Sequence, residues 1–150
     1  EHEWHGAIFA AAGLERIGLR PENSVDLDWM LPAPAQGAIT IVCRTDDDFS
    51  LNACNSLNDP TTALCTKIER DFLRALLGGC STPISALASI EDGTLVFKGN
   101  VCSPDGSKLI AVEKVCGIED GQDLGTIVGA EFLQIEEAEQ IIYNIWNAQK

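Results

Sequence analysis

Cysteine is the residue type in this 150-residue chain with the most chemistry available to it. Six cysteines lie at positions 43, 54, 65, 80, 102 and 116. No pair has the C-x-x-C spacing, which argues against close-spaced zinc sites and thioredoxin-like redox motifs. A chain of this length can bury a sizeable core without disulfides. We therefore expect free thiols in a reducing cytosol, and a cytoplasmic location.

Cys80 has a different setting from the other five cysteines. It follows Gly78 and Gly79, which end the clearest helical pattern of the chain, and Pro83 comes shortly after it. A loop that contains two glycines can carry a thiol out of its own domain. This context leaves two interpretations open, a reactive thiol and a buried, inert one, and it favours the second. The other five cysteines are expected to be small buried hydrophobic residues.

Two further groups of polar residues could hold a metal ion. His2 and His5 have an i, i+3 spacing that could place both on one face of a helix, but no third ligand lies nearby. Three consecutive aspartates, 46–48, could bind a cation, although a solvated loop is the better interpretation. We therefore expect no metal site.

The net charge of −13, from 23 acidic and 10 basic residues, limits the partners of the chain. A field of this sign repels nucleic acids and anionic membranes, so neither is an expected partner. No apolar run approaches the roughly 18–20 residues that span a bilayer. Any anion site must depend on a few arginines or on backbone N–H groups. The first residue is Glu1 and no signal-peptide pattern follows, so we expect a processed chain or part of a longer protein.

Helical patterns are clearest in the second half of the chain. Asp59 and Pro60 are typical of a helix start, and apolar residues at 64, 68, 72 and 76 form one stripe that ends at Gly78. After Gly121 the pattern is helical again. Apolar residues 124, 127, 128 and 132 share one side, and a second apolar set spans 138–146.

Between these helices the sequence predicts three strands. They cover residues 84–90, 94–102 and 108–115, and turn signals at 91–93 and 103–106 join them. Residues 59–150 are therefore expected to form a complete α+β domain, with a helix, a three-stranded antiparallel meander and one or two closing helices.

Residues 1–45 do not look complete. Small apolar residues 6–12 predict a strand buried on both faces, followed by a short helix at 14–17 that Gly18 ends. Residues 36–43 predict a second strand. Two strands and one helix are too little to close a core. Unpaired strands within 1–45 would leave this part disordered or cause self-association.

Two segments resemble the porphobilinogen deaminase family. One is residues 31–39 (LPAPAQGAI), continuing to Cys43 and Arg44. The other runs from Glu69 to Ile84 and contains GGCSTPI. Segments 10–18 and 103–107 resemble the family as well, in the same order. The resemblance covers nearly the whole chain and corresponds to about the C-terminal half of a full-length enzyme.

The resemblance implies a fold and an activity. The family has three domains, and the first two resemble periplasmic binding proteins with the active site in the cleft between them. Residues 1–58 would be an incomplete remnant of domains two and one plus a hinge, and residues 59–150 the C-terminal cofactor-attachment domain. Full-length members are monomeric transferases of tetrapyrrole (heme) biosynthesis. They condense four molecules of their substrate, porphobilinogen, onto a cysteine-linked dipyrromethane with loss of ammonia.

The resemblance also implies a set of cofactor-binding residues. Cys80 would bind dipyrromethane covalently through a thioether, and Ser81 would contact it alongside. Gln36 and Gly37 match positions that touch the cofactor, one by a side-chain amide and one by close backbone approach. For Gln36 and Ser81, an ordinary polar group of a loop or strand stays a substantial alternative.

Two residues near the start of the chain complete the set. Arg16 matches an arginine that binds acetate or propionate carboxylates, for which a guanidinium offers bidentate hydrogen bonds. Without the resemblance, a solvated residue on a short helix would be the expectation for Arg16. Ala10 would contribute through its backbone at a strand-to-helix turn.

No catalytic residue is expected in this chain. The acid/base aspartate, the substrate-binding lysine and most carboxylate-binding arginines of the family belong to the N-terminal portion, and none of the aspartates 46–48 matches that aspartate. The chain alone is therefore predicted to lack deaminase activity and to carry a bare Cys80 thiol. The alternative is a non-catalytic binding or interaction domain that has kept the third-domain scaffold.

Overall fold

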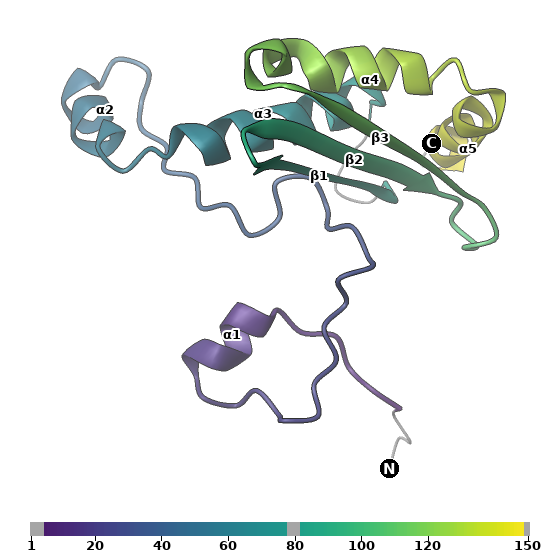
Figure 1. Cartoon of the computed structure of the whole chain (residues 1–150), viewed down its shortest axis with the longest axis horizontal. Helices are drawn as coiled ribbons and strands as arrows, with labels where there is room; N and C mark the ends of the chain where they lie inside the picture. Colours follow the sequence, from purple (N-terminus) through teal and green to yellow (C-terminus); the bar gives the residue numbers. More distant parts are fainter. Residues whose placement is uncertain (1–4, 78–81, 149–150) are drawn as a thin grey trace. The chain divides into compact units, whose positions relative to one another are not determined.

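The computed structural model describes residues 5–77 and 82–148 of the chain. These fall into two compact units, Glu1–Met30 and Leu31–Lys150, each of which is described by itself. Among the described residues, the first unit holds one helix, α1 (Ala11–Arg16). The second holds two helices, a three-stranded sheet, a 3-10 helix and two closing helices (Figure 1).

The predicted strand at residues 6–12 is wrong. Residues 6–10 are exposed and pair with no strand among the described residues, and Ala11 and Ala12 begin α1 instead. The predicted end of this helix is confirmed, because Gly18 has a φ of 67°. Its N–H donates to Glu15 O at 3.1 Å and the N–H of Leu19 donates to Leu14 O at 2.9 Å. This pair of hydrogen bonds is the Schellman arrangement, which satisfies the last carbonyls of a helix.

The second unit is built around α3 (Pro60–Ala75), which begins where the sequence predicts. The Asp59 carboxylate accepts a hydrogen bond from the N–H of Thr62 at 2.7 Å, and Pro60 occupies the first turn, where no N–H is needed. Ile68, Phe72 and Leu76 are fully buried, as the apolar stripe predicts. The helix ends at Ala75, earlier than predicted.

The sheet is an antiparallel meander in the order β1-β2-β3. Its strands are β1 (Ile84–Glu91), β2 (Thr94–Cys102) and β3 (Leu109–Gly117), close to the three predicted ranges. Ala88 pairs with Phe97, and Phe97 pairs with Lys114, which fixes the register across all three strands. The buried members of β1 and β2 alternate along each strand, so the sheet turns one face toward the helices. These features confirm the α+β class.

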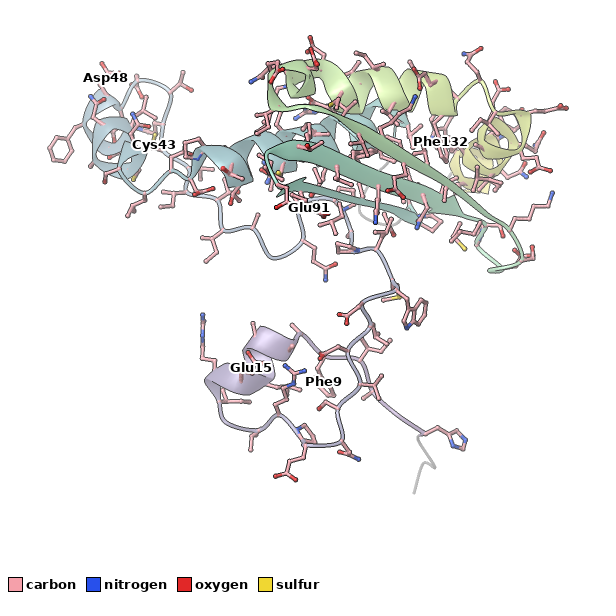
Figure 2. The ribbon with its side chains drawn as sticks, viewed as in Figure 1. Phe9, Glu15, Cys43, Asp48, Glu91 and Phe132 are labelled. Carbon is pink, nitrogen blue, oxygen red and sulfur yellow. The ribbon has the colours of Figure 1, made fainter. Side chains whose placement is uncertain are left out.

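The helices after the sheet complete the core. The 3-10 helix η1 (Ile118–Asp123) leads into α4 (Leu124–Phe132), and α5 (Glu136–Ala148) follows. Phe72 meets Phe97 and Phe132 edge-on, with ring centroids 5.2 and 5.6 Å apart. Figure 2 shows Phe132 between the helices and the sheet. Ile127 is 51% exposed, so its predicted place on the buried side of α4 is wrong.

The segment between Leu31 and α3 differs most from the prediction. Residues 38–43 form neither helix nor strand and pair with no strand that the structure describes, so the predicted strand at 36–43 is wrong, and Ile39 is 92% exposed. A helix that was not predicted, α2 (Asp48–Asn55), follows. The Asp47 carboxylate caps it by accepting from the N–H of Ser50 at 3.0 Å. The acidic run is thus a helix start as well as a solvated stretch.

None of the helices in residues 5–77 and 82–148 combines the length and the apolar character that crossing a membrane requires.

Candidate cofactor-attachment site

The Glu69 side chain joins two segments that are far apart in the sequence. Glu69 lies on α3, and one of its carboxylate oxygens accepts from the N–H of Ala88 on β1 at 2.9 Å. The other oxygen accepts from the N–H of Ala35 at 2.6 Å. Nearby, Pro32 O accepts from the N–H of Ala86 at 3.1 Å. The free edge of β1 is therefore covered by one carbonyl and one carboxylate instead of another strand.

This carboxylate is buried, with only 5% of the Glu69 residue surface exposed. Burial raises the pKa of Glu69 above its usual value, and the hydrogen bonds from Ala88 and Ala35 and the charge of Arg70 oppose that rise. A buried carboxyl group that accepts two backbone hydrogen bonds is a structural tie, since either donor would be left unsatisfied without it.

The Glu69 tie holds a tight turn that carries two of the expected site residues, Gln36 and Gly37. Ala35 has a φ of 59° and Gly37 a φ of 83°. A left-handed alanine costs about 1 kcal/mol or more, so the turn needs contacts that hold it in place. The structure places Gln36 and Gly37 in this turn, and not at the start of a strand as predicted.

The Gln36 side chain is oriented by its own turn. Its Oε1 accepts from the N–H of Ala33 at 3.0 Å, and its backbone N–H donates to Ala33 O at 3.0 Å. With the carbonyl end engaged, the Nε2 end of the exposed side chain has no partner among the described residues. Gln36 can therefore offer two N–H donors to a ligand acceptor.

The chain from α3 leads directly to the expected attachment cysteine. Leu77 takes the left-handed conformation, with a φ of 50°, and its N–H donates to Arg74 O at 2.9 Å. Gly78 and Gly79, which the sequence predicts to end this helix, lie outside the described residues. Cys80 and Ser81 lie outside the described residues. The description resumes at Thr82, whose O accepts from the N–H of Ile84 at 2.7 Å where β1 begins.

Ala10 and Arg16 lie together on the first unit, at the two ends of α1. Ala10 is the N-cap residue, and its O accepts from the N–H groups of Gly13 and Leu14 at 3.0 and 3.3 Å. Arg16 is exposed and forms no ion pair within the described residues. Its neighbour Arg20 is held instead by Glu15 and by Asp26, the latter at 2.6 Å. Arg16 is thus the guanidinium of this helix that is left free for a ligand.

A groove of about 420 Å³ lies beside α3, lined by residues 38–41, by α2, by residues 57–59 and by one side of α3 from Thr62 to Arg74. Its charges are mixed. Asp71 pairs with Lys67 at 2.6 Å and with Arg74 at 2.7 Å, so its single negative charge is shared between two cations. Arg70 donates to Thr40 Oγ1 at 3.3 Å and forms no carboxylate ion pair among the described residues.

The five cysteines within the described residues are free thiols. Cys65 is buried, as expected. Cys43 is exposed, and Cys54, Cys102 and Cys116 are only half-buried, so the expectation of burial holds for Cys65 alone among these five. Burial, followed by the charge of Glu69, raises the pKa of Cys65. Burial and two nearby acids raise the pKa of Cys116. A raised thiol pKa lowers the thiolate fraction, so neither is suited to act as a nucleophile.

The described residues contain no cluster of three or more His, Cys, Asp or Glu side chains that could hold a metal ion. The residue that the sequence analysis missed is Glu69. Its signal was present, because an acidic side chain lies beside Ile68 and three residues before Phe72, on the apolar side of the helix. A carboxylate in that position must have buried hydrogen-bond donors as partners.

Two protein-family models together match most of the chain. A family model described as "Porphobilinogen deaminase, dipyromethane cofactor binding domain" matches residues 1–52. A second, described as "Porphobilinogen deaminase, C-terminal domain", matches residues 63–134. The site elements named above therefore fall in two matched domains, with the Gln36 turn in the first and Glu69 and Cys80 in the second.

Individual proteins similar to this chain have the same family name as the two models. The chloroplastic porphobilinogen deaminase of Oryza sativa subsp. japonica is 40% identical over 83% of this chain and 37% of its own length. The porphobilinogen deaminase of Thermus thermophilus is 37% identical over 88% of this chain and 45% of its own length. That of Nitrosomonas europaea is 37% identical over 95% of this chain and 46% of its own length. The chain thus spans less than half the length of these curated relatives.

Proposed function

This chain belongs to the porphobilinogen deaminase family, and we propose that it forms the cofactor-carrying part of a hydroxymethylbilane synthase. In this proposal Cys80 holds dipyrromethane through a thioether. The observation that carries it is the match of residues 1–52 to a dipyrromethane-binding domain and of residues 63–134 to the C-terminal domain, with GGCSTPI inside the second match.

The donor groups of the chain fit such a cofactor. A dipyrromethane with acetate and propionate arms presents carboxylates, which are hydrogen-bond acceptors. The Gln36 amide has its carbonyl end occupied by the turn and its N–H₂ end without a partner in the described residues, and Arg16 has no competing ion pair there. Both side chains are therefore available as donors.

Each residue would have a separate task. Arg16 would hold a carboxylate in a bidentate manner, which a lysine cannot reproduce. Gly37, at a φ of 83°, would let the backbone approach the ligand closely. Ala10 would contribute through the backbone at the start of α1, and Ser81 through its hydroxyl next to Cys80. When bound, dipyrromethane supplies the free pyrrole carbon to which porphobilinogen units are added with loss of ammonia.

The division of labour within the chain is part of the proposal. Residues 59–150 would be the attachment domain, and residues 1–58 would belong to the two cleft-forming domains and the hinge, with a periplasmic-binding-protein-like architecture in the whole enzyme. The enzyme would be a monomeric transferase acting on porphobilinogen in tetrapyrrole (heme) biosynthesis. The free thiols at the five described cysteines support a reducing compartment such as the cytoplasm.

The chain by itself is proposed to be inactive and to carry a bare Cys80. It spans less than half the length of its relatives, and within the described residues the ion pairs of Lys67, Arg74 and Arg20 leave few cations unpaired for a polycarboxylate substrate. The acid/base aspartate of the family would come from the rest of the enzyme.

A chimera tests the proposal. The aligned segment of the Thermus thermophilus protein would be replaced by this chain, and porphobilinogen consumption would be measured for the chimera and for the 150-residue chain. We expect turnover by the chimera only, abolished by Cys80→Ser and retained by Cys102→Ser. A folded chimera that binds no pyrrole and turns nothing over would favour the alternative, a non-catalytic binding domain on the same scaffold.

A further inference from the structure

We propose that Glu69 is a positioning residue that couples the turn carrying Gln36 to the helix that leads to Cys80. The inference rests on the proposed function, because Gln36 and Cys80 are its cofactor residues. Glu69 itself touches no ligand in this account. It acts by fixing the distance and orientation between two segments that the sequence separates.

Two hydrogen bonds of the Glu69 carboxylate couple the segments directly. From α3, the Glu69 carboxylate reaches the N–H of Ala35 at 2.6 Å and the N–H of Ala88 at 2.9 Å. Ala35 immediately precedes Gln36, while Glu69 and Cys80 are joined by the rest of α3 and its C-terminal turn. The Glu69 side chain therefore connects three parts of the structure: the turn that carries Gln36, helix α3 and the edge strand β1.

A carboxylate is the group that this geometry requires. Both partners are N–H donors, and an ionised carboxylate has an acceptor oxygen for each. Glutamine has nearly the same shape but only one acceptor, so its N–H₂ end would face one of the two donors. A shorter or apolar side chain would leave both donors unsatisfied in a buried position.

The turn depends on this tie because its backbone is strained. Ala35 has a φ of 59°, which an alanine seldom adopts without support. Among the described residues, the Ala35 N–H has no partner other than Glu69, whereas the neighbouring hydrogen bond from Ala86 N–H to Pro32 O holds only the start of the segment. Loss of the Glu69 acceptor should therefore free the Gln36 turn while α3 and the sheet persist.

Amide hydrogen exchange on the 150-residue chain tests the coupling. Rates would be compared at Ala35 and Ala88 and at two β2 amides, Phe97 and Val101. In Glu69→Leu, which removes both acceptor oxygens, we expect exchange at Ala35 and Ala88 to rise about tenfold or more relative to the β2 amides, as loss of a buried charged hydrogen bond implies. A rise that is equal at all four positions, or no rise at Ala35, overturns the proposal.

Two control variants separate local from global loosening. Val128→Ala removes buried side-chain volume from α4 and should raise exchange at all four amides by a common factor. Glu131→Gln removes a carboxylate that pairs with Lys114 at 2.6 Å and should leave Ala35 unchanged. If Glu69→Leu does not fold, the unaltered chain decides, because an unprotected Ala35 amide beside protected β2 amides contradicts the role of Glu69.

The measurement needs no cofactor, so it fails or succeeds separately from the proposed function. A Cys80 that never carries a pyrrole, together with a local response at Ala35, would refute the function and leave the coupling of the two segments established. A Cys80 that carries the cofactor, together with a uniform response, would refute the role of Glu69 alone.

Discussion

Arg16 and Arg20 lie four residues apart and differ in what holds them. Arg20 pairs with Glu15 and Asp26, and both acids raise its pKa further. Arg16 has no such partner in the described part of the chain. An arginine already committed to two carboxylates can bind a third only by giving one up, so Arg16 is the one suited to ligand binding.

Replacement of Arg16 should therefore weaken porphobilinogen turnover in the chimera. A charged hydrogen bond to a ligand carboxylate contributes about 1.5–3 kcal/mol, so Arg16→Ala should lower kcat/KM about 10- to 100-fold. Steady-state kinetics of the chimera at varied porphobilinogen concentration measures this change in kcat/KM. Arg44→Ala is the matched control, because Arg44 is exposed and reaches Asp46 only at 3.6 Å. Equal effects of the two variants would remove Arg16 from the site.

At this scale the sequence predicted the attachment cysteine and the donors around it only through resemblance to a family. Its own signals favoured an inert Cys80. The apolar stripe of Leu64, Ile68, Phe72 and Leu76 predicts a buried face, but it does not indicate that Glu69 shares that face. The partners of Glu69 are backbone N–H groups 34 and 19 residues away, and no local pattern encodes them.

At the scale of elements, α3 and α4 approach each other through glycine. A Cβ built on Gly125 would lie 2.0 Å from Ile68 O, and one on Gly129 would lie 2.4 Å from the Ala75 Cβ. Such close approach lets the two helices share the core around Phe72. It also explains why two glycines stand inside α4 despite their low helix propensity.

Gly125→Ala should therefore destabilise the second unit, although alanine is the better helix former. The propensity gain is about 1 kcal/mol, while overpacking against a backbone oxygen typically costs about 1–3 kcal/mol and more where nothing can move. Urea unfolding followed by circular dichroism should show a net loss of about 1–2 kcal/mol. Gly13→Ala in α1 is the control, since its added Cβ meets nothing within 4 Å. A Gly125→Ala protein as stable as the parent would contradict this packing.

The β2–β3 turn has its own electrostatic anchor, Asp105. Its carboxylate accepts from the Ser103 hydroxyl at 2.5 Å and from the Ser107 N–H at 3.1 Å, and these bonds lower its pKa to about 2. Because the folded pKa is below the unfolded value of 3.8, the contribution to stability is present above that value. It is lost as the pH falls through about 2.

An NMR titration of the Asp105 carboxyl carbon should therefore give a midpoint of about 2. Asp105→Asn should remove the part of the acid dependence of stability that lies between this midpoint and the unfolded value. Ser103→Ala should move the midpoint upward, because the Ser103 hydroxyl makes the largest contribution to the shift. An unshifted titration in the parent chain would show that the turn is not held by Asp105.

Most of the elements in residues 59–150 could be predicted because their signals are local. Asp59-Pro60 starts a helix by its own chemistry, and Asp92-Gly93 takes positive φ values of 50° and 78° in the turn that was expected there. Residues 6–12 and 36–43 have strand-like composition, but a strand exists only with a partner. None of the described residues pairs with them, so composition alone misassigned both.

At the scale of the whole molecule, the two halves of the chain differ in how their apolar residues are used. Within the described ranges, residues 59–148 bury a continuous core of 17 hydrophobic side chains. Residues 5–58 instead expose a series of large apolar side chains. These are Ile8, Phe9, Ile17, Leu19, Val25, Trp29, Met30, Ile39, Ile41, Val42, Phe49, Leu51 and Leu57. Exposure on this scale is typical of surfaces that another polypeptide covers.

The 150-residue chain should therefore self-associate in solution. Sedimentation velocity is expected to show a sedimentation coefficient that rises with concentration. Ile39→Lys combined with Val42→Lys should reduce this rise, since both side chains are exposed on a segment that has no strand partner among the described residues. Leu109→Lys, on the exposed side of β3, serves as the control. A monomer at every concentration would count against the interpretation of this surface.

The central claim concerns the thiol of Cys80, and peptide mapping by mass spectrometry tests it most directly. The purified chimera would be digested and the peptide that spans Gly78–Ile84 identified. The account predicts a dipyrromethane adduct on this peptide, located to Cys80 by fragmentation, and unmodified peptides for the other five cysteines. An active chimera whose Cys80 peptide has the unmodified mass, or whose pyrrole is found on another cysteine, would contradict it.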